Sequence, residues 1–252
     1  QYWHPMAKET VAAIKQEAPD RVVLLPLYPQ FSTTTAGTSL RAFHREAQTQ
    51  GLAAPIDSLC CFPLQAGFLA ETIGNIRQSL SVATKSGKPR LLLSAHGLPE
   101  RTIGAGDPYQ WQVERTANAI VDAFGDTDLD HVICYQSRVG PMEWIGPATE
   151  DEISRAGADG VSVVLAPVAF VSEHSETLVE LDMDYRELAE KVGVPSYTRV
   201  ATVGTTAAFI DGLASMARSA LERSDGDAGA RCGNPSDGRC CPDGFTTCVH
   251  GT

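Results

Sequence analysis

The sequence has no apolar run approaching the roughly 18 residues that a membrane-spanning helix needs. Positive charge is scarce as well: 20 Lys and Arg stand against 31 Asp and Glu, a net charge of -11, which argues against binding nucleic acid by charge attraction. The glycine patterns of dinucleotide-binding folds and P-loop proteins are missing, so a nucleotide cofactor has no support. The G-x-S-x-G turn is also missing, which disfavours a serine hydrolase.

Apolar runs alternate with helical patterns along the 252 residues. Strands joined by long helices are typical of parallel sheets covered on both faces, so we expect an α/β fold. The length fits two similar halves, residues 1–84 and 85–222, followed by a compositionally different tail, 223–252. The predicted strands are 21–27, 56–62, 90–94, 131–135, 161–171 and 198–203, and the predicted helices are 5–18, 39–48, 63–84, 109–124, 149–156, a segment from 175 onward, and 205–221.

An acidic row follows the apolar run 161–171. Its members recur at spacings of three and four residues, which places them on one face of a helix; they are Glu176, Glu180, Asp184 and Glu187. Such a row is either a solvated acidic face or a lane of oxygen ligands for a divalent cation, with His174 as a nitrogen ligand at its head. The pattern alone favours the solvated face, because exposed acidic faces are common.

In open α/β folds, ligands bind beyond the carboxyl ends of the strands. The polar side chains expected there are Tyr28, Ser32, His96, Gln136, Ser137, Arg138, Glu173, His174 and Glu176. His96 is either a hydrogen-bonded turn residue, or a base or metal ligand whose neighbour Gly97 lets a flat substrate approach the backbone. Trp144 is either a lid over the cleft or a packing residue.

Four long stretches carry a resemblance to a known family. They are LPLYPQFSTTTAGTSL (26–40), LLLSAHGLPERTIGAGDPYQ (91–110), CYQSRVGPMEWIGP (134–147) and PVAFVSEHSETLVELDMDY (167–185). In this order they resemble ferrochelatase, and the resemblance covers about residues 1–222. It implies two Rossmann-like domains of the chelatase fold around a porphyrin cleft. It also implies insertion of Fe²⁺ into protoporphyrin IX, with release of two protons.

The resemblance implies roles for particular residues. His96 and Glu176 match a catalytic histidine and carboxylate that face each other across the macrocycle, and which of them binds the metal is disputed. Further metal or proton ligands would be His174, preceded by the acid Glu173, and then Glu180 and Asp184. The substrate-binding side chains would be Tyr2, Tyr28 and Trp144, joined by Ser32, Gln136 and Ser137 from the strand-end argument.

The family usually begins roughly a hundred residues earlier, judged from its two-domain length, and that segment includes a lip over the porphyrin. We therefore expect the chain as given to be inactive or impaired. The alternatives are insertion into coproporphyrin III, or an inactive fragment that binds porphyrin or metal. We expect a cytoplasmic protein; peripheral membrane contact and the oligomeric state stay open.

The tail is rich in Gly, Asp and Pro and poor in large apolar residues, so we expect it not to fold by burial. It nevertheless holds Cys232, Cys240, Cys241 and Cys248, whose spacing lacks the paired C-x-x-C of common zinc sites. Some ferrochelatases carry a 2Fe–2S cluster at the C-terminus, and where the animal enzymes take one ligand from the hydroxyl-rich loop, this chain has Thr33. The resemblance thus favours a cluster held by the four tail cysteines, over zinc or free thiols.

Overall fold

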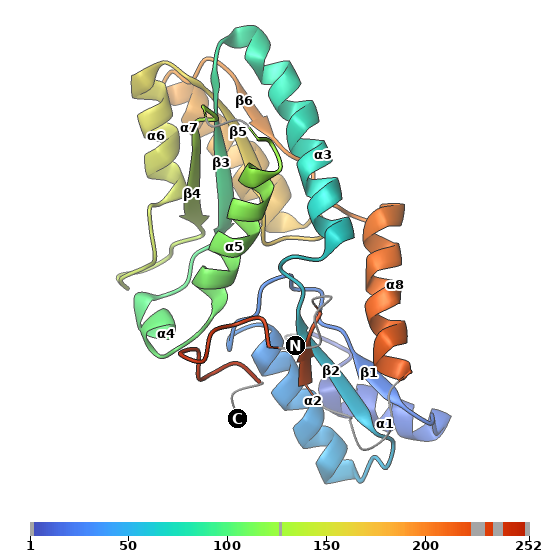
Figure 1. Cartoon of the computed structure of the whole chain (residues 1–252). Helices are drawn as coiled ribbons and strands as arrows, with labels where there is room; N and C mark the ends of the chain where they lie inside the picture. The colour runs from blue at the N-terminus through green and yellow to red at the C-terminus, as the bar shows by residue number, and fades with distance from the viewer. Residues whose placement is uncertain (1–2, 126–127, 223–229, 234–238, 250–252) are drawn as a thin grey trace.

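The computed structural model describes residues 3–125, 128–222, 230–233 and 239–249. It contains two parallel sheets with helices on their faces (Figure 1), which confirms the expected α/β class. The first sheet has the order β1-β2-β7 and the second has the order β4-β3-β5-β6. The strands are β1 (Val22–Leu24), β2 (Ile56–Cys61), β3 (Pro89–His96), β4 (His131–Gln136), β5 (Ser162–Pro167), β6 (Tyr197–Arg199) and β7 (Ala230–Cys232).

The central strands of the second sheet are apolar on both faces because helices cover both. In β3, Leu91 and Leu93 belong to one hydrophobic cluster, while Leu92, pointing the opposite way, belongs to another. All three are fully buried. Along the chain, the helices are α1 (Ala7–Glu17), α2 (Ala36–Gln50), α3 (Ala66–Ala83), α4 (Glu100–Gly104), α5 (Tyr109–Asp122), α6 (Thr149–Asp159), α7 (Tyr185–Lys191) and α8 (Ala207–Leu221), with a short 3₁₀ turn η1 (Thr84–Ser86) after α3.

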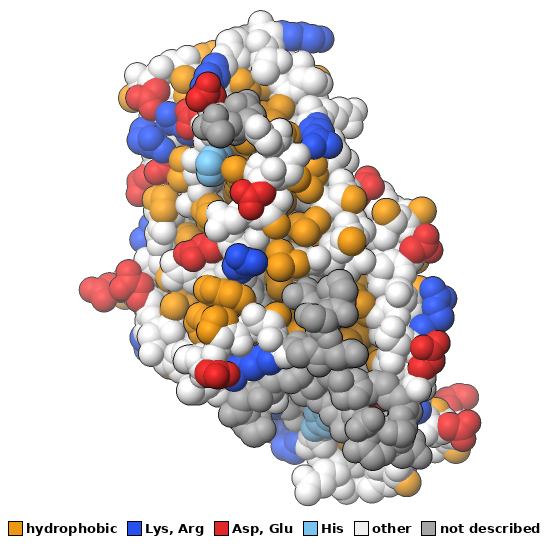
Figure 2. Space-filling view, viewed as in Figure 1, with side chains coloured by type: hydrophobic (Ala, Val, Ile, Leu, Met, Phe, Trp, Pro, Cys, Tyr) orange, Lys and Arg blue, Asp and Glu red, His pale blue; other side chains and the backbone are white. Residues whose placement is uncertain are grey.

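Helix α8 returns to the first half of the chain. The sequence assigns it to the second unit, yet it packs against α3 and against β1 of the first sheet (Figure 1). The division of the chain near residue 84 stays a prediction. None of the described helices is both long enough and apolar enough to cross a membrane. On the face shown in Figure 2, the described basic and acidic side chains are interspersed.

The tail differs from its expectation. Its strand β7 pairs in parallel with β2, where Ser58 lies opposite Ala230 and Cys61 opposite Cys232. Cys232, Cys241 and Cys248 are buried. The prediction that this segment does not fold by burial is therefore wrong for its described residues. Backbone pairing with β2 and packing of small thiol side chains replace the missing large apolar groups.

The segment after β5 also departs from a regular helix. Residues Glu176–Asp184 form a π-helix, η2, which continues directly into α7. A π-helix is bonded from i to i+5 and holds between four and five residues in each turn. Side chains four residues apart therefore lie nearly above one another, which keeps Glu176, Glu180 and Asp184 in a row.

A buried polar seam joins the two halves. The Asp107 side chain is 1% exposed, and its Oδ2 accepts hydrogen bonds from Ser32 Oγ at 3.0 Å and from Thr33 N and Oγ1, both at 2.7 Å. Its Oδ1 accepts from Tyr109 N at 3.0 Å. One carboxylate thus ties the hydroxyl-rich loop after β1 to the start of α5.

Two glutamines extend this seam. Gln30 Nε2 donates to Thr116 Oγ1 and to the Val168 carbonyl, each at 3.0 Å. Gln112 Oε1 accepts from Phe31 N at 2.7 Å. Both glutamines are buried, where unpaired amides would cost about 1–3 kcal/mol each. The seam therefore fixes how the strand ends of the two sheets face each other.

Candidate active site

A cavity of about 650 Å³ opens at the carboxyl ends of β1, β3 and β5, within the size range of small-molecule sites. Its lining residues are Leu27, Tyr28, Gln30, Thr34, Thr35, His96, Leu98, Tyr109, Ala169, Phe170, Val171, Ser172, His174 and Glu176. Residues far apart in the sequence, after three different strands, thus share one cavity, because parallel strands end at the same edge of a sheet.

His96 ends β3 and presents one ring nitrogen to the cavity. Its Nδ1 lies 2.8 Å from the Gly97 carbonyl oxygen, and because a carbonyl only accepts, Nδ1 carries the proton in the neutral ring. Nε2 then holds a lone pair and lies 3.9 Å from Glu176 Oε2. The imidazole is thus oriented as a proton acceptor or metal ligand.

Glu176 begins η2 and faces His96. The Glu176 side chain is 39% exposed, but its Oε2 atom is covered and has no hydrogen-bond partner among the described residues. A buried carboxylate oxygen opposite an imidazole lone pair is unfavourable unless a proton or cation comes between them. The pair therefore has the chemistry of a site that accepts positive charge.

The gap between this pair is narrower than expected. A flat ring between two groups needs about 3.5 Å of van der Waals distance on each side, so about 7 Å in all, against the 3.9 Å between His96 Nε2 and Glu176 Oε2. The structure brings the two groups together, but it does not leave room for a macrocycle between them. A planar ligand in this cavity has to lie against the pair.

His174 lines the same cavity, with its ring centroid 4.6 Å from that of Phe170. Its Nδ1 accepts from Glu176 N at 3.2 Å, so in the neutral ring Nε2 carries the proton. His174 therefore offers a donor rather than a lone pair in this arrangement, and its role as a metal ligand stays a prediction.

Glu180, one turn beyond Glu176, is held by other residues. Its Oε1 accepts from Ser137 N at 2.8 Å and its Oε2 from Ser137 Oγ at 2.5 Å. Ser137 has a positive φ of 57°, which turns both groups toward the carboxylate. Ser137 thus positions Glu180 and is not part of the cavity lining. Asp184 lies exposed at the far end of η2.

The other predicted substrate residues divide into three groups. Tyr28 lines the cavity and is 42% exposed. Ser32 and Gln136 are buried outside its lining, bonded to Asp107 and to Ser94 Oγ respectively. Trp144 also lies outside the lining, and Tyr2 lies outside the described residues.

Gly97 has a different role from the one expected. A Cβ at this position would lie 3.0 Å from Gln136 O, 3.1 Å from Arg138 Cγ and 3.3 Å from Trp144 Cε3. The space beside Gly97 is thus filled by the protein itself. The glycine allows Trp144 to pack against the end of β3, which supports the packing interpretation of the tryptophan.

The sequence model of the Ferrochelatase family matches residues 1–221. The chain belongs to the ferrochelatase family. It is 50% identical over 232 residues to the ferrochelatase of Caulobacter vibrioides (strain NA1000 / CB15N). This match covers 92% of this chain and 66% of that protein. This confirms the resemblance found in the sequence.

Other relatives agree. The chain is 44% identical to the ferrochelatase of Hyphomonas neptunium, and this match covers 98% of this chain and 66% of that protein. It is 42% identical to the ferrochelatase of Rickettsia typhi, and this match covers 98% of this chain and 69% of that protein. The chain thus spans about two thirds of the length of these ferrochelatases. The fold also matches the crystal structure of the sirohydrochlorin chelatase SirB from Bacillus subtilis subspecies spizizenii in complex with cobalt, with a TM-score of 0.60 over 90% of this chain and 80% of that one. At 11% identity this match shows the chelatase-like fold alone.

Two aromatic side chains in the cavity lining of this ferrochelatase-family chain escape sequence reasoning. Tyr109 and Phe170 look like core aromatics in the sequence, but both line the cavity. Burial raises the pKa of Tyr109, and the nearby Tyr135, Asp107 and Glu176 add to the rise, so its hydroxyl stays protonated. The sequence signal that could identify Tyr109 is its position directly after Asp107 and Pro108, at the end of the polar loop that follows the third predicted strand.

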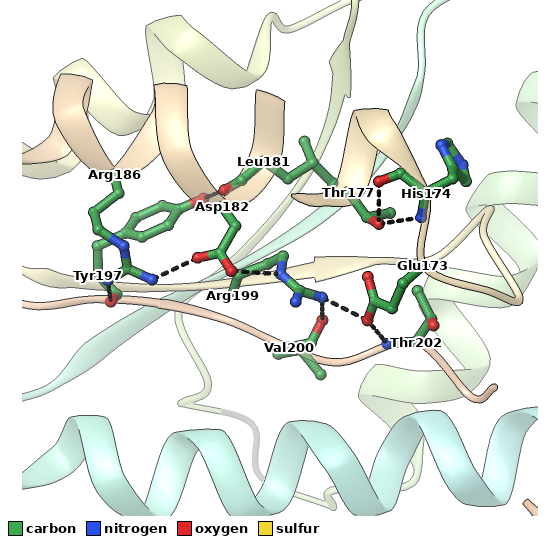
Figure 3. A network of polar contacts seen from close by, with 10 residues as sticks. All are labelled: Glu173, His174, Thr177, Leu181, Asp182, Arg186, Tyr197, Arg199, Val200 and Thr202. Carbon is green, nitrogen blue, oxygen red and sulfur yellow. Dashed lines mark hydrogen bonds and ion pairs between the residues drawn. The ribbon is translucent and has the colours of Figure 1, made fainter. Parts of the chain in front are cut away.

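A charged network holds η2 against β6 (Figure 3). Arg199 Nη1 donates to Glu173 Oε1 at 2.8 Å, and its Nε lies 3.6 Å from Asp182 Oδ2. Thr202 N donates to the same Glu173 oxygen at 3.0 Å. Because Glu173 precedes η2 and Asp182 lies near its end, one arginine fixes the whole segment that carries Glu176.

Glu173 makes this anchoring pH-dependent. Its burial alone would raise the carboxyl pKa, but hydrogen bonds from Thr177, Thr202 and Arg199 outweigh this and lower the pKa below its ordinary value of 4.5. The carboxylate therefore stabilises the fold above about pH 4.5, and the contribution is lost as the pH falls through the lowered pKa.

Replacement of Glu173 with Gln should cost up to about 1 kcal/mol of unfolding free energy at neutral pH, the size of a partly exposed ion pair. The difference from the parent chain should shrink below about pH 4.5 and vanish once Glu173 is protonated. Thermal unfolding across this pH range measures it, with the exposed Glu190→Gln as matched control. A difference that stays constant with pH would contradict the assignment.

Proposed function

We propose that this chain forms the metal-insertion site of a ferrochelatase, which inserts Fe²⁺ into protoporphyrin IX and releases two protons in haem biosynthesis. The observation that carries the proposal is the position of two side chains in one cavity: His96 Nε2 lies 3.9 Å from Glu176 Oε2, which has no hydrogen-bond partner among the described residues. Membership of the family supports it. Neither a coproporphyrin III chelatase nor a non-catalytic fragment gains support from the comparisons.

The two groups suit the chemistry. Insertion of iron into a neutral porphyrin releases two pyrrole protons, which requires bases near the ring centre. The lone pair of His96 Nε2 and the free Oε2 of Glu176 are two such acceptors, adjacent at one wall of the cavity. Carboxylate and imidazole groups also help Fe²⁺ to shed its water. In this proposal, Tyr28 and Phe170 line the path of the ring, and iron is a substrate.

The proposal is tested in a chimaera in which residues 1–252 replace the matching region of the Caulobacter vibrioides ferrochelatase. We expect the chimaera to insert Zn²⁺ into a soluble porphyrin, followed by fluorescence. His96→Ala and Glu176→Gln should each lower kcat about 100-fold or more, since general base catalysis contributes at least that much. The exposed His131→Ala and Glu190→Gln are the matched controls.

Porphyrin affinity distinguishes the alternatives. If both variants retain affinity but lose turnover, the pair performs chemistry; if both retain full turnover, the proposal is wrong. Residues 1–252 alone are assayed beside the chimaera, and we expect them to be inactive or impaired. If they insert zinc as fast as the chimaera does, this expectation is wrong.

We also propose that the tail holds a 2Fe–2S cluster with help from β2. Six thiols meet at this place, those of Cys60, Cys61, Cys232, Cys240, Cys241 and Cys248. Cys60 and Cys61 both reach it because the β2–β7 register shifts between Leu59 and Cys61. The sequence indicated only the four tail cysteines, because β2 reads as an ordinary buried strand.

The thiol spacing fits tetrahedral metal sites. With a metal–thiolate bond of about 2.3 Å, two ligands on one tetrahedral ion lie about 3.8 Å apart. The Sγ distances are 3.8 Å for Cys60–Cys232, 3.9 Å for Cys61–Cys240 and 3.8 Å for Cys240–Cys241, while Cys60–Cys61 is shorter at 3.4 Å. Gln112 Nε2 donates to Cys241 Sγ at 3.0 Å, as the donors around bound thiolates do. Two disjoint pairs, Cys60–Cys232 and Cys240–Cys241, would supply the four ligands.

The ligand set is testable on the chain itself. Anaerobically purified protein should contain iron and acid-labile sulfide and absorb visible light. The double variant Cys60→Ser, Cys61→Ser should lose most of both, while Cys134→Ser, in the other sheet, should retain them. Retention by the double variant would favour the tail-only set, and a colourless, iron-free parent chain would refute the cluster.

For localisation, we propose a cytoplasmic protein with peripheral membrane contact. None of the seven cysteines forms a disulfide within the part of the chain that the structure describes, and thiols are usual in a reducing compartment. In the loop after β4, Val139 is 74% exposed and Met142 40% exposed, and contact with a bilayer surface would bury both. Sedimentation with phosphatidylglycerol vesicles should pellet the chain, and Val139→Ser with Met142→Ser should weaken this; equal sedimentation would contradict the proposal.

A further inference from the structure

The hydroxyl of Tyr185 bridges two carboxylates. Its oxygen lies 3.1 Å from Glu180 Oε1 and 3.0 Å from Glu150 Oε1. Tyr185 begins α7 and is 3% exposed, whereas Glu150 lies in the first turn of α6 and is partly exposed. A buried hydroxyl thus connects Glu180 with a carboxylate that reaches solvent.

The bridge has fewer protons to donate than it has acceptors. A phenol has one proton to donate, while both neighbours are acceptors when ionised. The hydroxyl therefore satisfies one carboxylate at a time, and the second contact is a full hydrogen bond only when the other carboxyl carries a proton. The three oxygens have the geometry in which a proton that arrives at one end displaces a proton at the other.

The bridge is suited to protons and not to iron. Glu180 is already held by two hydrogen bonds from Ser137, through N and Oγ, and by the contact with Tyr185, which leave at most two of its roughly four acceptor positions for a metal. Burial raises the pKa of Tyr185, and the carboxylates of Glu150 and Glu180 raise it further. The group thus stays a neutral phenol, which is a poor ligand for Fe²⁺.

We propose that Glu180, Tyr185 and Glu150 form an outlet that carries the pyrrole protons from the cavity to solvent. The inference rests on the proposed function, which supplies those protons. In each transfer, Glu180 holding a proton donates it to the Tyr185 oxygen while Tyr185 passes its own proton to Glu150. Two O–H bonds break and two form, and Glu150 then releases one proton to water.

The inner end of the outlet lies near the catalytic pair. Glu176 and Glu180 stand on successive turns of η2, so their side chains leave the helix from the same face, one turn apart. In the proposed outlet, a water molecule carries the proton between the two carboxyl groups. The acidic row thus divides after Glu180, with Tyr185 and Glu150 leading sideways to α6 and Asp184 continuing along the helix.

The test uses Tyr185→Phe in the zinc-inserting chimaera. This change keeps the ring and removes only the hydroxyl. We expect kcat to fall about tenfold or more, with KM for porphyrin and for zinc unchanged, because the hydroxyl is not in the cavity lining. Raising the concentration of a small buffer that does not bind zinc, such as morpholinoethanesulfonate, at constant pH and ionic strength, should restore part of the lost rate. Glu150→Gln should show the same loss and rescue.

The matched control is Tyr197→Phe, a second buried tyrosine against η2, whose hydroxyl donates to the Leu181 carbonyl at 2.5 Å. It should change thermal stability without any rate gain from buffer. Zinc insertion by Tyr185→Phe at the parental rate, or a loss that buffer does not relieve, overturns the outlet alone. Absence of insertion by the parent chimaera overturns the proposed function and the outlet with it.

Discussion

The structure depends on one buried carboxylate. Asp107 binds the hydroxyl-rich loop of the first half and the start of α5 in the second half. A charge in this position is stable only because four donors satisfy it. Without it, the loop with Thr34 and Thr35 and the helix with Tyr109 would lose their common anchor, and all three residues line the cavity.

The reactive pair depends on a second constraint, the anchoring of η2. Arg199 on β6 binds Glu173 before this helix and approaches Asp182 near its end, so the segment that carries Glu176 is held at two points. His96, in contrast, is fixed by its place at the end of β3 and by the Gly97 carbonyl. The 3.9 Å between the two side chains therefore reflects sheet geometry on one side and an ion-pair network on the other.

Much of this could be predicted from the sequence. The alternation of apolar runs with helical patterns gave the class and most elements, because buried parallel strands are apolar on both faces. The strand-end argument brought Tyr28, His96, His174 and Glu176 to one cavity. The resemblance supplied their roles.

The remainder depended on tertiary contacts that no local pattern encodes. Ser32 and Gln136 hold the scaffold together rather than lining the cavity, since buried partners at Asp107 and Ser94 compete for their polar groups. The tail folds because β2 offers it an unpaired strand edge, and Cys60 and Cys61 join its thiols through a shift in strand register. The π-helix could not be foreseen either, because its spacing of polar groups resembles that of an α-helix.

The length of η2 has a consequence for variation in this segment. An α-helix advances about 100° per residue, from its 3.6 residues per turn, and a π-helix accommodates one residue more in a turn. A single residue deleted between Glu176 and Glu180 would remove the extra residue that the wider turn accommodates, and the turn would rewind as an α-helix. Glu180 would then still face Ser137, and Tyr185 would still face Glu150. A residue deleted from α7, which is already α-helical, would instead turn every later side chain by about 100°. Natural variants should therefore lose a residue only within η2 and not within α7.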